Sequence, residues 1–168
     1  MKDFFKNFYR YFYKESLIKE IEKDCPIPLI PEKTNREKLL DIAITFYNID
    51  PTPRDEQPDE VACVHSLTTI IKKLIPDFPI MTYTPTLLDY LLKDIRFKET
   101  NEMKEGIIII SPTGEGKIIG HTGIIGKNGT IYSNNSLNGL WDTKYTIPSW
   151  IKRYCVDGNI PIYLFELL

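Results

Sequence analysis

The segment Gly120-His121-Thr122-Gly123-Ile124-Ile125-Gly126 decides the fold, because it predicts a strand in which a histidine opens a β-branched run. Its threonine and isoleucines are β-branched, a type that favours strands. A second run over 130–134 follows Lys127-Asn128-Gly129, in which Asn-Gly supplies the positive φ angles of a tight turn. The two runs predict a β-hairpin in which a rigid strand fixes the direction of the His121 side chain.

A cysteine lies upstream in Asp59-Glu60-Val61-Ala62-Cys63-Val64-His65-Ser66-Leu67, which predicts a loop that enters an apolar helix. We expect this helix to run to about Leu74, with one face made of Leu67, Ile70, Ile71 and Leu74. A thiol at a helix N-terminus lies at the positive end of the helix dipole, which favours the thiolate. Cys63 is therefore a candidate nucleophile.

The rest of the chain predicts helices first and strands afterwards. Further helices are expected over 36–47, 86–92 and 148–154, and strands over 106–111, 118–126, 130–134 and 160–167. The strand over 106–111 is a continuous apolar run of the kind that is buried on both faces. The expected class is α+β, with an antiparallel sheet packed against the cysteine-bearing helix.

Aromatic residues recur at three- and four-residue steps near the start of the chain, at Phe4, Phe5, Phe8, Tyr9, Phe12 and Tyr13. This spacing predicts an amphipathic helix docked on the rest of the protein, with a membrane-surface or partner-binding helix as the alternative. We therefore expect two regions, an N-terminal helical region over 1–47 and a domain over 48–168.

The composition limits the function classes. A chain of 168 residues that is 42% hydrophobic and 26% charged suits a globular protein with a sizeable core. The formal net charge is −2, so no global basic field indicates a nucleic-acid partner. No apolar run approaches the roughly 18–20 residues that cross a bilayer. The start of the chain does not read as a signal peptide, so the localisation stays undetermined.

The three cysteines, Cys25, Cys63 and Cys155, are an odd number and do not support a complete disulfide framework. The spacing of cysteines and histidines does not indicate a metal site. We therefore expect no metal and no cofactor, and read Cys25 and Cys155 as inert.

The sequence offers the groups that thiol-dependent hydrolysis needs: a thiolate, a base that shares its proton, and a residue that orients the base. Cys63 and His121 supply the first two. If Asn128-Gly129 is a two-residue turn, Gly123 faces Asn134, which then lies diagonal to His121 and can hold its ring. A one-residue bulge would place Asn135 there instead.

His65 is the competing base. It follows Cys63 by two residues, roughly 200° around a helix, so its ring should point away from the thiol. We therefore interpret His65 as a structural histidine.

The stretch from Asp50 to Leu168 resembles the NlpC/CHAP-like papain-fold cysteine hydrolases of bacteriophage lysins and related bacterial proteins. The matching pieces are Ala62-Cys63-Val64-His65-Ser66, Ile109-Ile110-Ser111-Pro112-Thr113-Gly114, the segment Gly120 to Gly126, and Ile131-Tyr132-Ser133-Asn134-Asn135-Ser136. The resemblance implies a papain-like fold with Cys63 as nucleophile, His121 as base and Asn134 as orienting residue. The implied substrate is an amide or peptide bond of bacterial cell-wall peptidoglycan.

The same resemblance suggests an oxyanion-hole amide at Gln57, which precedes Cys63 by six residues, although the backbone N–H of Cys63 could serve equally well. The sequence departs from many relatives in having Ile107 after Gly106 and Val64-His65 after Cys63. These departures leave the cleaved bond open. A catalytically silent wall-binding or virion structural module with the same fold is the alternative, and a protease acting on protein substrates is a third possibility.

Overall fold

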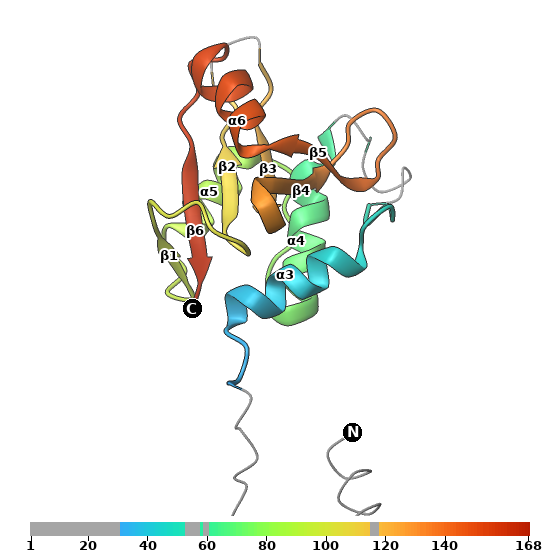
Figure 1. Cartoon of the computed structure of the whole chain (residues 1–168), viewed down its shortest axis with the longest axis vertical. Coiled ribbons are helices and arrows are strands. Elements are labelled where there is room, and N and C mark those ends of the chain that lie inside the picture. The colour runs from blue at the N-terminus through green and yellow to red at the C-terminus, as the bar shows by residue number, and fades with distance from the viewer. Residues whose placement is uncertain (1–30, 53–57, 59–60, 115–117) are drawn as a thin grey trace, which may run out of the picture. The chain divides into compact units, whose positions relative to one another are not determined.

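The computed structural model describes residues 31–52, 58, 61–114 and 118–168 (Figure 1). Residues Lys33–Leu168 form one compact unit. The aromatic helix expected near the start of the chain, Cys25 and Gln57 lie outside the described residues. In the described part, no helix has the length and apolarity that crossing a membrane requires.

The described residues form four helices and one six-stranded antiparallel sheet. The helices are α3 (Asn35–Thr45), α4 (Cys63–Leu74), α5 (Thr84–Leu91) and α6 (Ile147–Trp150), the last continued by a π-helical turn over Ile151–Val156. The strands are β1 (Phe97–Glu99), β2 (Ile108–Ser111), β3 (His121–Ile125), β4 (Thr130–Asn134), β5 (Trp141–Thr146) and β6 (Tyr163–Leu167). Their order in the sheet is β1-β6-β2-β3-β4-β5. The expected α+β class and antiparallel sheet are confirmed.

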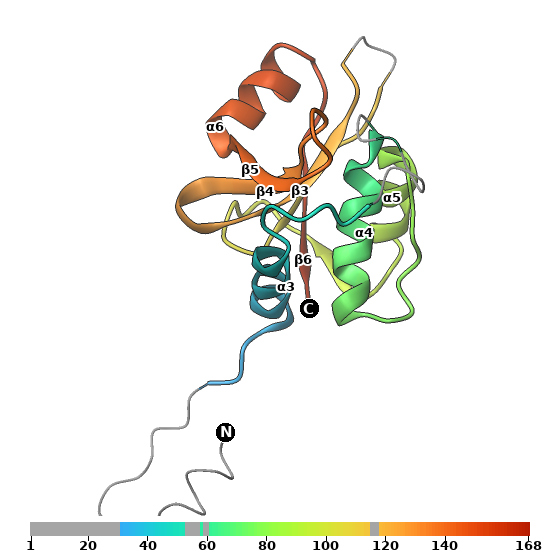
Figure 2. The ribbon, with the colours of Figure 1, turned by 90° about the vertical axis from the view of Figure 1, so that its right-hand side faces the viewer.

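The sheet separates two apolar clusters, because successive side chains of a strand point to opposite faces. Ile108, Ile110 and Ile124 pack with residues of α3, α4 and α5 on what we call the helix-covered face. Ile109, Ile125 and Ile131 pack with Trp150 and Tyr154 on what we call the aromatic face. Figure 2 shows α4 and α5 on one side of the strands and α6 on the other.

The β3–β4 hairpin has a different register from the predicted one. Ile125 pairs with Ile131 and Ile124 with Tyr132. The connection is a three-residue turn, Lys127–Gly129, in which Asn128 and Gly129 both have positive φ. One extra turn residue shifts the pairing by one position and moves each facing side chain to the other face. The predicted pairing of Gly123 with Asn134 is therefore wrong.

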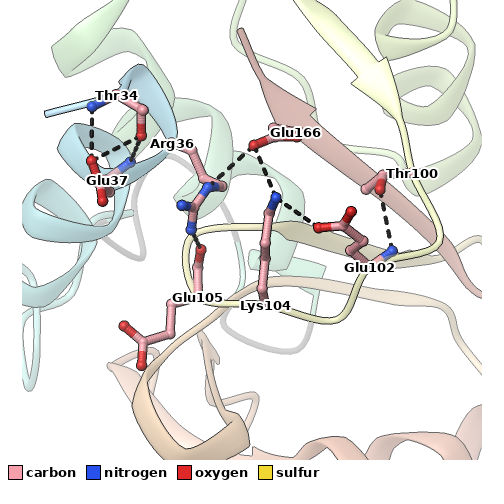
Figure 3. Close-up of polar contacts among 8 residues, drawn as sticks. All are labelled: Thr34, Arg36, Glu37, Thr100, Glu102, Lys104, Glu105 and Glu166. Atoms are coloured by element: carbon pink, nitrogen blue, oxygen red, sulfur yellow. Dashed lines mark hydrogen bonds and ion pairs between the residues drawn. The ribbon is translucent and has the colours of Figure 1, made fainter.

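Helix α3 is tied to the last strand and to the loop before β2. A capping box starts the helix, since the Thr34 hydroxyl accepts from the Glu37 N–H and the Glu37 carboxylate accepts from the Thr34 N–H. Arg36 Nε lies 3.2 Å from Glu166 Oε1, and the guanidinium donates to the Glu105 carbonyl (Figure 3). The sequence-based division groups α3 with the N-terminal region over 1–47, but the helix lies inside the compact unit.

Gly106 occupies a position that excludes a side chain. Its φ is 80°, and a Cβ there would lie 2.5 Å from the carbonyl oxygen of Arg36. We expect Gly106→Ala to lower the free energy of unfolding by about 2–4 kcal/mol, because the backbone strain and the clash add. Urea denaturation measures this loss, with Gly114→Ala as the matched control, since a Cβ at Gly114 meets nothing within 4 Å. Equal losses in the two variants would contradict the prediction.

Candidate functional site

Cys63 is the first residue of α4, and its thiol is buried against β3. The side chain belongs to the cluster on the helix-covered face and is 7% exposed. The backbone N–H groups of Cys63, Val64 and Thr122 act on the sulfur as hydrogen-bond donors. Thr122 directly follows His121, so the start of α4 places the thiol beside the backbone of the strand that begins at His121.

Burial governs the ionisation of this thiol. Loss of hydration raises the pKa of Cys63 from 9.0 to about 11, and the three backbone donors offset only part of the increase. The position of Cys63 in the sequence led us to expect that the helix dipole favours the thiolate. In the structure the desolvation of the sulfur is the larger effect, so Cys63 is a neutral thiol at pH 7.

The His121 ring lies on the aromatic face. It stacks on Trp150, with ring centroids 5.3 Å apart, and on Tyr154 at 6.1 Å, and it meets Tyr145 edge-on at 5.6 Å. Ile125 lies four residues further along β3, and therefore on the same face as His121, and it belongs to the apolar cluster of the aromatic face. The thiol of Cys63 and the ring of His121 therefore lie on opposite faces of the sheet, and the structure records no hydrogen bond between these two described residues.

The environment of His121 favours the neutral imidazole. Burial first, and then the positive charges of Arg153 and Lys144, lower the pKa of His121 from 6.5 to about 3. A hydrogen bond with the backbone of Asn134 acts in the opposite direction. The Nε2 atom is buried without a hydrogen-bond partner. This structure therefore holds a neutral thiol and a neutral imidazole rather than an ion pair.

The Asn134 side chain does not reach His121. The corrected register turns this side chain to the helix-covered face, where Asn134 pairs across the sheet with Trp141 of the same cluster. Its Nδ2 donates to the Gly139 carbonyl at 2.9 Å. Only the backbone of Asn134 acts on the imidazole. The predicted orienting role of the Asn134 amide is therefore not seen in this structure, and the three-residue turn is the reason.

Asn135, the alternative orienting residue, is engaged elsewhere. Its Nδ2 donates to the Asp142 carboxylate at 2.8 Å, and its Oδ1 accepts the Leu137 N–H at 3.1 Å. Both ends of the Asn135 amide thus hold the loop between β4 and β5. Neither of the two candidate asparagines orients the His121 ring through its side chain.

Two serines that the sequence-based prediction missed lie on the aromatic face with His121. Ser111 pairs with His121 across β2 and β3, and its hydroxyl accepts the Trp150 indole N–H at 3.0 Å. Ser133 adjoins Gly123, and its hydroxyl is buried without a hydrogen-bond partner. Counting three turn residues instead of two would have placed Ser133 on the face of His121.

His65 contacts Thr52, a residue that precedes Cys63 in the chain. Its Nδ1 lies 3.0 Å from the Thr52 hydroxyl, which also lies 2.9 Å from the Ser66 hydroxyl. These contacts tie Thr52 to α4 and agree with the structural role expected for His65.

Comparisons of the chain with known protein families, curated proteins and solved structures return no significant match. Function therefore has to be inferred from the residues of the site.

Proposed function

We propose that this chain is a papain-like cysteine hydrolase that cleaves amide or peptide bonds of bacterial peptidoglycan, with Cys63 as nucleophile and His121 as base. The observation that carries the proposal is the position of the Cys63 sulfur, which interacts with the Thr122 N–H one residue from His121. The order of a cysteine-bearing helix followed by antiparallel strands supports it. The substrate class comes from the sequence resemblance.

In the proposed reaction the Cys63 sulfur attacks the carbonyl carbon of the scissile amide. His121 takes the thiol proton and returns it to the leaving amine as the carbon–nitrogen bond breaks. The Cys63 N–H at the start of α4 can donate to the oxyanion that forms on the carbonyl oxygen. Water then cleaves the thioester, with His121 as the base that deprotonates it, and the thiol is regenerated.

In this proposal, the described arrangement of Cys63 and His121 is the resting state of the enzyme. Catalysis requires the His121 imidazole to leave its stack with Trp150 and Tyr154 and to approach the sulfur. His121 is the first residue of β3, and the pairing of β3 with β4 covers Ile124 and Ile125. A rearrangement at His121 would break its pairing with Ser111 of β2 and would leave the pairing of β3 with β4 intact.

A catalytically silent wall-binding module is the second candidate. It is favoured by the placement of Cys63 and His121 on opposite faces of the sheet and by the neutral state of both groups. In that case the buried thiol and the stacked imidazole are parts of the two apolar clusters.

Incubation of the full chain with purified peptidoglycan separates the candidates. Amidases and endopeptidases both free one amino group per bond cut, so we expect new amines and soluble fragments that mass spectrometry identifies. Cleavage of an unfolded protein but not of the wall would indicate a protease instead. Sedimentation of the chain with the wall, without any new amines, would support the silent module.

We expect iodoacetamide to label Cys63 at least about tenfold more slowly than Cys155 at pH 8, because only thiolates react and a pKa of about 11 leaves few of them. Cys155 is exposed and Cys63 is buried. Mass spectrometry of the two cysteine-containing peptides measures the rates, and a urea-unfolded sample is the control in which the difference should disappear. Faster labelling of Cys63 in the folded chain would contradict the buried neutral thiol.

A further inference from the structure

Arg153 differs from the other arginines that the structure describes. Arg36 is ion-paired with Glu166 and Arg96 with Asp94. Arg153 is exposed, and within the described residues no carboxylate forms an ion pair with it. Among the described residues, its positive charge is therefore not neutralised by a carboxylate.

Two tyrosines hold this guanidinium beside His121. The Arg153 Cζ lies 5.6 Å from the ring centroid of Tyr154, within the range of a cation–π contact. Tyr154 and Tyr145 act on the guanidinium and raise the pKa of Arg153. The rings of both tyrosines also contact the His121 ring. The guanidinium thus lies at the edge of the cluster that contains the proposed base.

The surrounding charges leave this position electropositive. Lys144, exposed on β5, adds a second positive charge that acts on His121. The Asp157 carboxylate is occupied by Lys152, whose Nζ lies 2.9 Å away. The Asp142 carboxylate accepts hydrogen bonds from Asn135 and from the Lys144 backbone. These two described carboxylates are therefore engaged with partners other than Arg153.

We infer that Arg153, framed by Tyr145 and Tyr154, binds a carboxylate of the substrate beside His121. A guanidinium presents paired N–H donors in the fork geometry that matches the two oxygens of a carboxylate. The inference rests on the proposed function in assigning this carboxylate to the substrate, and it narrows that substrate to an amide that carries a free carboxylate.

The test compares two probes that differ only in this group, N-acetyl-alanyl-alanine with a free carboxylate and the same dipeptide with a C-terminal amide. Each is titrated into the ¹⁵N-labelled full chain carrying Cys63→Ala, so that binding is measured without turnover. The Trp150 indole and Arg153 Nε–H signals report on the site. We expect saturable shifts with the free carboxylate and binding at least about tenfold weaker with the amide, the loss typical of a charge-assisted pair.

Arg153→Gln should reduce the affinity for the carboxylate probe to that for the amide probe. Arg153→Lys should restore part of it, because the charge returns without the fork. Lys152→Gln is the matched control, since this neighbouring exposed cation is paired with Asp157 and should leave binding unchanged. A dispersed spectrum of each variant verifies folding.

Equal affinity for the two probes, binding of neither, or full affinity in Arg153→Gln would overturn the inference. The outcome is separable from that of the proposed function. Carboxylate-selective binding without any cleavage of peptidoglycan by the unaltered chain would keep the site and refute the hydrolase. Cleavage of peptidoglycan without a preference for the carboxylate probe would keep the hydrolase and refute the carboxylate site.

Discussion

Replacing Cys63 with alanine is expected to abolish the release of amino groups from peptidoglycan, with a fall in rate of at least about ten-thousandfold. Without the sulfur no thioester forms, and the remaining backbone donors and His121 have no nucleophile to assist. Initial rates of amine release from equal amounts of folded protein measure the effect. The fold should survive, since removal of one buried sulfur costs about 1–2 kcal/mol.

Cys155→Ala is the matched control, because Cys155 is an exposed cysteine on the turn after α6 and should keep full activity. Circular dichroism and thermal unfolding of the two variants establish that both are folded. Undiminished amine release by Cys63→Ala would remove Cys63 from the mechanism. Loss of activity in both variants would point to the fold rather than to the thiol.

Lowering the pH from about 6.5 to 3 is expected to destabilise the protein through His121. The pKa of His121 is about 3 in the folded chain, whereas that of a solvated histidine is 6.5. Between these values the unfolded chain binds a proton that the folded chain does not, so the stabilisation is present above pH 6.5 and is lost as the pH falls. The difference between the two pKa values corresponds to a loss of at most about 4–5 kcal/mol in the free energy of unfolding.

The variant His121→Phe isolates this effect, because phenylalanine keeps a ring in the stack with Trp150 and cannot bind a proton. The free energy of unfolding, measured by urea titration at several pH values, should fall less in the variant over this range. Arg96 lowers the pKa of Asp94, so the contribution of Asp94 to the free energy of unfolding is also lost at low pH. This loss is the same in both proteins and cancels in the comparison. Parallel pH profiles would contradict the buried neutral imidazole.

The elements that sequence reasoning predicted correctly have strong local signals. The helix that begins at Cys63 ends at Leu74 as expected, because its apolar residues repeat with helical spacing. The continuous apolar run before Ser111 forms a strand in which every residue is buried. The two missed strands lack such signals. Strand β1 has three residues, and β5 contains Asp142 and Lys144 and carries an irregularity in its pairing with β4.

The site was harder to predict because its geometry depends on a single turn residue and on burial. The sequence placed Cys63 at a helix start and His121 on a strand, and both positions are confirmed, although the strand begins at His121 rather than at residue 118. The face on which His121 lies relative to Asn134 followed from an assumed two-residue turn, and the turn has three. The aromatic stack that buries His121 joins β3 to Trp150 and Tyr154, residues too distant in the chain for any local pattern to connect.

The most direct test of the proposed function is mass spectrometry of the protein after an acid-quenched reaction with peptidoglycan, since acid preserves a thioester. We predict that the peptide containing Cys63 gains the mass of an acyl fragment of the wall, and that this gain is absent when the peptidoglycan is omitted. Release of wall fragments with the acyl mass on another residue, or an unmodified Cys63 together with no release at all, would contradict the proposal.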